Sequence, residues 1–112
     1  MTDAVKAKAE ELKYAILFSE EYKNYDMYRK KLHEHPELME QVNHFRMDNV
    51  RMQIEKASSG NVDVQRFATE NVELLNNSLV RDFLNSELIL CRMMQKINSI
   101  LVSDIELELD FL

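Results

Sequence analysis

The sequence predicts an all-α fold, in which long antiparallel helices form a bundle that ends in a short extended C-terminal tail. The 112 residues include a single Gly and a single Pro. Because tight turns depend on these residues, few connections are available and the all-β classes are disfavoured. Apolar residues also recur at steps of three and four along most of the chain, which is typical of a buried helix face. A chain of this length fits a single domain, residues 1–112, with one modest core.

The first two predicted helices meet near Ser19. The first helix has Thr2 or Asp3 as its N-cap. Its apolar stripe consists of Val5, Ala9, Leu12 and Ile16. Ser19 is followed by two glutamates, and a hydroxyl before acidic residues favours a new helix start, so the chain either breaks or bends there. The second helix runs to about Glu34.

The third predicted helix opens at Pro36, with His35 in the N-cap position. Proline suits the first helical turn because its missing N–H would have no partner there. We expect the helix to end near Ala57, because Gly60 can adopt the left-handed conformation that stops a helix. One apolar stripe on this helix consists of Leu38, Val42, Phe45 and Met52, and an adjacent one consists of Met47, Val50 and Ile54.

The sequence pattern in the second half of the chain predicts two further helices. Asn61 or Asp63 caps the first of them, which reaches a weak break at residues 76–78, where Asn-Asn-Ser brings together poor helix formers. Its apolar stripe consists of Val64, Ala68, Val72, Leu75 and Leu79. Residues 79–102 then form a helix that is apolar nearly all round. Beyond it, apolar and acidic residues alternate as in a half-buried extended segment. This tail crosses a neighbouring helix or a partner subunit, or it frays.

The apolar helix over residues 79–102 indicates that the chain associates with a partner. A helix with apolar residues on every side must be covered on several sides, and so short a chain offers little to cover it. We therefore expect a homodimer or a hetero-complex. The predicted contact residues are Leu84, Leu88, Cys91, Met94, Ile97, Leu101, Ile105, Leu107, Leu109 and Phe111.

Charge and cysteine content restrict the class of protein further. The formal net charge is −6, which argues against a phosphate-binding surface made of clustered Lys and Arg. Cys91 is the single cysteine, so no intramolecular disulfide forms and no oxidising compartment is indicated. The N-terminus shows no signal sequence, and no apolar run approaches the ~18 residues that a membrane span needs. These features predict a cytoplasmic protein.

No pattern in the chain indicates an enzyme or a bound cofactor. One glycine cannot build a Gly-rich phosphate loop. Cys91 lies among apolar neighbours in the most apolar helix, where a thiol is usually inert packing. We therefore predict no catalytic residue, no metal ligand and no cofactor.

The three histidines provide the first alternative function, a metal site at the corner between the second and third helices. His33, His35 and His44 all lie in the stretch HEHPELMEQVNHF. However, side chains two residues apart on a helix point about 200° apart. The spacings HExxH and Glu-x-x-His, which are typical of zinc and di-iron sites, are also absent. The spacing favours a structural corner, and metal binding there remains the alternative.

A second alternative is weak RNA binding by a basic, tyrosine-containing part of the second helix. Its residues are Tyr22, Lys23, Tyr25, Arg29, Lys30 and Lys31. Aromatic rings stack on bases and cations attract phosphates. Because the chain as a whole is acidic, we expect no direct nucleic-acid binding of useful strength.

Several short patterns carry a family resemblance. They are the run A-x-x-L-x-x-A-I-x-x-S-x-E-Y over residues 9–22, Pro-Glu-Leu at 36–38, Phe-Arg at 45–46 and Gln53. In these patterns the chain resembles the YlbF/YmcA family of small bacterial helical regulatory proteins. Residues 83–112 resemble the second long helix and closing tail of that family, so the likeness covers nearly the whole chain.

The resemblance implies an all-helical, antiparallel protein that commonly forms dimers. Characterised relatives act in complexes that control competence, sporulation and biofilm formation, partly together with an mRNA-processing ribonuclease. Some of those complexes bind iron–sulfur clusters through cysteines, but a lone Cys91 cannot supply the usual four thiolates. The resemblance transfers no active-site residue. It therefore implies a non-enzymatic adaptor whose partners are a second copy, other regulatory proteins or a ribonuclease complex.

Overall fold

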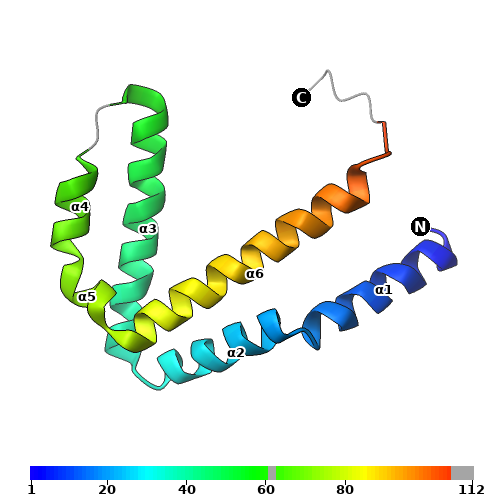
Figure 1. Ribbon diagram of the computed structural model, residues 1–112, viewed down its shortest axis with the longest axis horizontal. Helices are drawn as coiled ribbons and strands as arrows, with labels where there is room; N and C mark the ends of the chain where they lie inside the picture. The colour runs from blue at the N-terminus through cyan, green and yellow to red at the C-terminus, as the bar shows by residue number, and fades with distance from the viewer. Residues whose placement is uncertain (61–62, 107–112) are drawn as a thin grey trace. The chain divides into compact units, whose positions relative to one another are not determined.

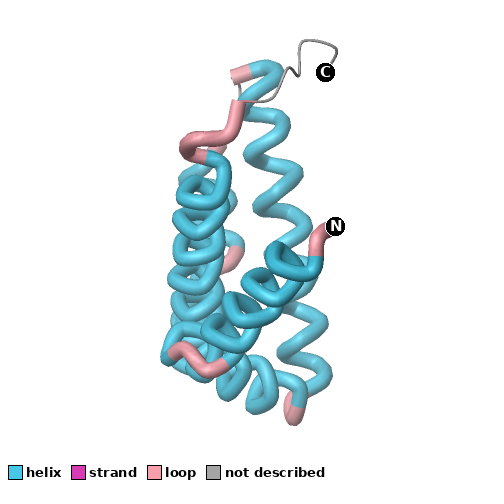
Figure 2. Tube along the Cα trace, turned by 90° about the vertical axis from the view of Figure 1, so that its right-hand side faces the viewer, coloured by secondary structure: helices cyan, strands magenta, loops and turns pink. Residues whose placement is uncertain are grey.

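The computed structural model describes residues 1–60 and 63–106. Every regular element in these ranges is an α-helix (Figure 1, Figure 2), which confirms the all-α prediction. The helices are α1 (Asp3–Leu17), α2 (Glu20–His33), α3 (Pro36–Ser59), α4 (Val64–Glu70), α5 (Val72–Asn76) and α6 (Ser78–Val102).

The helices belong to two compact units. The terminal unit comprises Met1–Tyr25 and Ser86–Leu112, and the central unit comprises Asp26–Asn85. Helices α2 and α6 each contribute residues to both units. That residues 1–112 fold as one domain stays a prediction.

Ser19 separates α1 from α2, at the position where the sequence predicted a new helix start. Its Oγ donates to the carbonyl oxygen of Ile16 at 2.6 Å and accepts from the N–H of Tyr22 at 3.2 Å. One hydroxyl therefore closes α1 and caps α2. Glu20 and Glu21 occupy the first turn of α2, where the positive end of the helix favours carboxylates.

The single proline sets the start of α3 and the single glycine sets its end. Pro36 opens the helix with His35 in the N-cap position, as predicted, although the His35 side chain makes no capping hydrogen bond. The helix continues to Ser59 and stops at Gly60, whose φ of 70° is left-handed. A left-handed glycine stops a helix because it bears no Cβ that would clash.

The helical segment that follows Asp63 is interrupted at one position that the apolar pattern did not predict. Asp63 caps α4, as expected, by accepting a backbone N–H. At Asn71, α4 gives way to α5, because the Asn71 Nδ2 donates to the Phe67 carbonyl at 2.8 Å and competes with helix continuation. The break predicted near residues 76–78 is confirmed, since the Asn77 Oδ1 accepts from two N–H groups at the start of α6.

The fully buried core of the described chain lies in the central unit. Leu32 of α2, Val42 of α3, and Val80 and Phe83 of α6 are each at most 1% exposed. The Arg46 guanidinium carbon lies 5.7 Å from the centroid of the Phe83 ring, within the range of cation–π attraction. The burial of Val42 confirms the first predicted stripe of α3.

Helix α4 packs on α3 through two phenyl rings. The ring centroids of Phe45 and Phe67 lie 5.4 Å apart, with 22° between the ring planes. By contrast, Val64 and Val72 of the predicted stripe are 47% and 49% exposed. Phe67, rather than these valines, therefore anchors α4 and the turn at Asn71.

Apolar side chains of the terminal unit are less completely covered. Val5 and Leu12 of α1 and Leu101 of α6 line one apolar groove, so the start of α1 lies beside the end of α6 (Figure 1). Among the described residues of this unit, the one buried side chain is the polar Ser86, which is 6% exposed. The apolar faces of α1 and α6 thus remain at least partly open to solvent.

Candidate functional site

Several of the predicted contact residues on α6 are exposed to solvent. Leu88, Met94 and Leu101 are 46%, 43% and 55% exposed, and Cys91 is exposed as well. Leu84 and Ile97 are half-buried. A partner contact on this helix would therefore cover apolar side chains that now face water. Despite its apolar content, neither α6 nor any other helix of residues 1–60 and 63–106 could cross a membrane.

The predicted contact residues of the tail are described only at its start. Ile105 is 57% exposed and lies beyond the end of α6. Leu107, Leu109 and Phe111 lie outside the described residues, so their role as contacts stays a prediction.

A second apolar surface lies on α3. Met47, Val50 and Ile54, the adjacent stripe predicted for this helix, are 64%, 56% and 63% exposed. Together with the flanking Arg46 and Arg51, they line an open hollow of ≈ 960 Å³. This stripe therefore faces away from the core that Val42 on the same helix helps to form.

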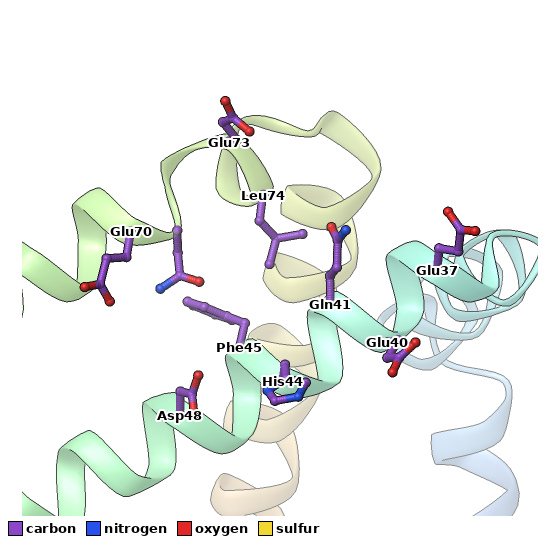
Figure 3. A pocket seen from close by; sticks show the side chains of 10 residues that line it. Glu37, Glu40, Gln41, His44, Phe45, Asp48, Glu70, Glu73 and Leu74 are labelled. Carbon is purple, nitrogen blue, oxygen red and sulfur yellow. The ribbon is translucent and has the colours of Figure 1, made fainter.

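The central unit also contains a groove between α3 and the α4–α5 turn, which the sequence did not predict. Its volume is ≈ 640 Å³. Phe45 reaches into the groove from α3 and Leu74 from α5 (Figure 3). The other lining residues are polar: Glu37, Glu40, Gln41, His44, Asp48, Glu70, Asn71 and Glu73. Five carboxyl groups and no lysine or arginine therefore surround two apolar side chains.

Two of these five carboxylates have arginine partners. Arg51 Nη1 lies 3.6 Å from an Asp48 oxygen, and Arg66 Nε lies 3.0 Å from a Glu70 oxygen. Both arginines line a smaller adjoining groove along α3 and α4 rather than this one. The negative charge is therefore least compensated at the other end of the groove.

The three histidines do not come together. His33 ends α2, His35 occupies the N-cap position of α3, and His44 lines the groove near Glu40 (Figure 3). Across residues 1–60 and 63–106, no three His, Cys, Asp or Glu side chains are grouped as metal ligands. The geometry thus gives the histidine corner no preformed ligand set.

The basic part of α2 is engaged within its own helix. Asp26 pairs with Arg29 and with Lys30, whose Nζ lies 2.8 Å from an Asp26 oxygen. The hydrogen bond from Arg29, followed by that from Lys30, lowers the pKa of Asp26 below its ordinary value. The carboxylate neutralises part of the positive charge that RNA binding would use. The Tyr22 and Tyr25 rings lie tilted at 6.4 Å from one another, rather than as parallel platforms.

Comparison with known proteins identifies the family. The family model described as "Control of competence regulator ComK, YlbF/YmcA" matches residues 5–106. No curated protein and no solved structure shows significant similarity to the chain. The match spans all six helices apart from the first residues of α1. The chain therefore belongs to the YlbF/YmcA family, a regulatory family named for the control of competence.

Proposed function

We propose that this protein is a non-enzymatic regulatory adaptor of the cytoplasm that acts as a homo-oligomer, with the exposed face of α6 as its contact surface. The observation that carries this proposal is the open apolar face itself. Burying a fully exposed apolar side chain contributes about 1.5–3 kcal/mol. Leu88 and Met94 are nearly half exposed, so covering the rest of each would contribute somewhat less than half of that. A second copy offers the same face to cover it.

The regulatory part of the proposal rests on the family. The family is described by the control of a competence regulator, which favours recognition of other proteins over chemistry. We propose that the assembled protein acts within a complex that governs developmental programmes such as competence, sporulation and biofilm formation. An mRNA-processing ribonuclease is the partner that the family resemblance suggests for such a complex.

Two adjacent residues of α6 allow a matched test of the contact surface. Leu88 and Ile89 are 46% and 45% exposed, so aspartate at either position costs the folded monomer a similar, small amount. Consecutive helical residues point about 100° apart, so only one of them should lie centrally in the contact. We expect Leu88→Asp to weaken self-association by at least about tenfold, because each copy would bury a carboxylate without a partner. Ile89→Asp should change it little.

Sedimentation equilibrium over a range of protein concentrations measures this difference. Wild-type protein that stays monomeric at high micromolar concentration would refute the proposal, as would equal effects of the two substitutions. The exposed Cys91 thiol supplies an independent readout. Its alkylation rate should fall as the wild-type concentration rises and stay constant in Leu88→Asp. Competence development with each variant in the source organism then tests whether self-association is needed for regulation.

A further inference from the structure

The groove between α3 and the α4–α5 turn is a second surface suited to binding, separate from the face of α6. All of its lining residues belong to the central unit. Its walls are fixed by local structure, since the stacked Phe45 and Phe67 rings hold α4 to α3. The hydrogen bond from Asn71 to the Phe67 carbonyl holds the turn that carries Leu74. Both walls of the groove are therefore tied to contacts within the central unit.

The apolar residues of the groove set the kind of contact it can make. Phe45 and Leu74 are both half-buried and lie on opposite walls (Figure 3). A volume of ≈ 640 Å³ exceeds what one ion or one water needs and is within the range of sites that hold several groups. An aliphatic side chain inserted between these two residues would remove apolar surface from water on both sides.

Charge decides which partner fits around that apolar centre. Glu37, Glu40 and Glu73 stand around the groove (Figure 3), and in the described part of the chain none of the three has an ion-pair partner. Glu37 and Glu40 are spaced by about one turn of α3, so a helix lying along α3 would meet them with bases spaced three to four residues apart. Phosphate-bearing ligands are repelled by the same carboxylates.

We propose that this groove is a docking site for a basic amphipathic helix of a partner protein. One aliphatic side chain of that helix inserts between Phe45 and Leu74, and lysine or arginine side chains on its flanks pair with Glu37, Glu40 and Glu73. This is the helix-in-groove mode, in which apolar anchors give affinity and charge gives selectivity. The proposal does not depend on self-association through α6.

Two synthetic peptides of about 16 residues test the two parts of the recognition separately. The first is a helical peptide with leucine on one face and lysine around it. The second has serine in place of each leucine and the same lysines. Fluorescence anisotropy with the full-length protein at low salt should show tight binding of the first peptide only. If the serine peptide binds equally well, or if neither binds, the proposal is wrong.

Charge variants of the protein distinguish the groove from the general acidity of the chain. The variant Glu37→Gln/Glu40→Gln/Glu73→Gln removes three groove charges. An exposed ion pair contributes about 0.2–1 kcal/mol, so losing three pairs should weaken binding of the leucine peptide by between about threefold and a hundredfold. Added salt should reduce the difference, because the pairs are partly exposed.

A matched control changes the net charge by the same amount elsewhere. The variant Glu10→Gln/Glu20→Gln/Asp104→Asn alters only exposed residues outside the groove and should leave binding within about twofold of wild type. Equal weakening by both triple variants would overturn the proposal, because it would show non-specific attraction. Leu74→Ser tests the apolar contact. It should weaken binding of the leucine peptide and leave any residual binding of the serine peptide unchanged. The helix content of the variant is measured alongside to show that it is folded.

Discussion

Replacing Gly60 by alanine tests whether the end of α3 depends on backbone conformation alone. Gly60 has φ +70°, and a Cβ added there would meet no atom within 4 Å. Steric contact with neighbouring groups therefore contributes nothing to the cost. The left-handed conformation costs an L-residue about 1–2 kcal/mol. Alanine also restricts the unfolded chain, which offsets about 0.4–1 kcal/mol of this.

The net expectation is a loss of about 1 kcal/mol in the free energy of unfolding, which corresponds to roughly 4 °C in Tm for a chain of this size. Urea denaturation followed by circular dichroism measures it. Gly60→Asn should cost less than Gly60→Ala, because asparagine enters the left-handed region more readily. Gln53→Ala, at an exposed position in the same helix, should stay within about 0.5 kcal/mol of wild type. A Gly60→Ala variant as stable as wild type would refute the reasoning.

Two further predictions concern the core and the acid side of the stability profile. Phe83→Ala should cost about 3–5 kcal/mol, since the ring is 1% exposed, whereas Phe18→Ala, at a residue that is 71% exposed, should cost less than about 0.5 kcal/mol. Similar losses in urea denaturation would contradict this assignment of the core. The hydrogen bond from Arg29 lowers the pKa of Asp26 below its ordinary value of 3.8. The ionised Asp26 therefore stabilises the fold at pH values above its unfolded-state pKa. This stabilisation disappears as pH falls through the lower folded-state pKa. The stability difference between wild type and Asp26→Asn should therefore shrink well below pH 3.8, and a difference that is independent of pH would count against the pairing.

The sequence predicted helix limits well where one residue determines them through local chemistry. The hydroxyl of Ser19, the ring of Pro36 and the missing Cβ of Gly60 each fix a helix end through contacts only a few residues away. Such contacts are visible in a sequence because the partner is always the neighbouring turn. The apolar stripe through Val42 was predictable for the same reason, since its period is a local property.

Features that join distant segments were not predictable in this way. The apolar pattern after Asp63 continued through Asn71, so no local pattern indicated that the helix breaks there or that Phe67 packs on Phe45. The groove depends on that pairing, because its carboxylates come from α3 on one side and from α4 and α5 on the other. Periodicity also assigned Met47 to a stripe without showing that this stripe faces solvent.

The double role of Ser19 has a consequence for how the N-terminal helix can vary. The same hydroxyl bonds the Ile16 carbonyl in the last turn of α1 and the Tyr22 N–H in the first turn of α2. The start of α2 is therefore set at this joint and not by residues nearer the beginning of α1. One residue inserted or deleted in α1 would rotate the face ahead of it by about 100° and leave α2 in register. An insertion ahead of Ile16 would therefore change how the apolar face of α1 meets Leu101 of α6, while Ser19 still sets the start of α2.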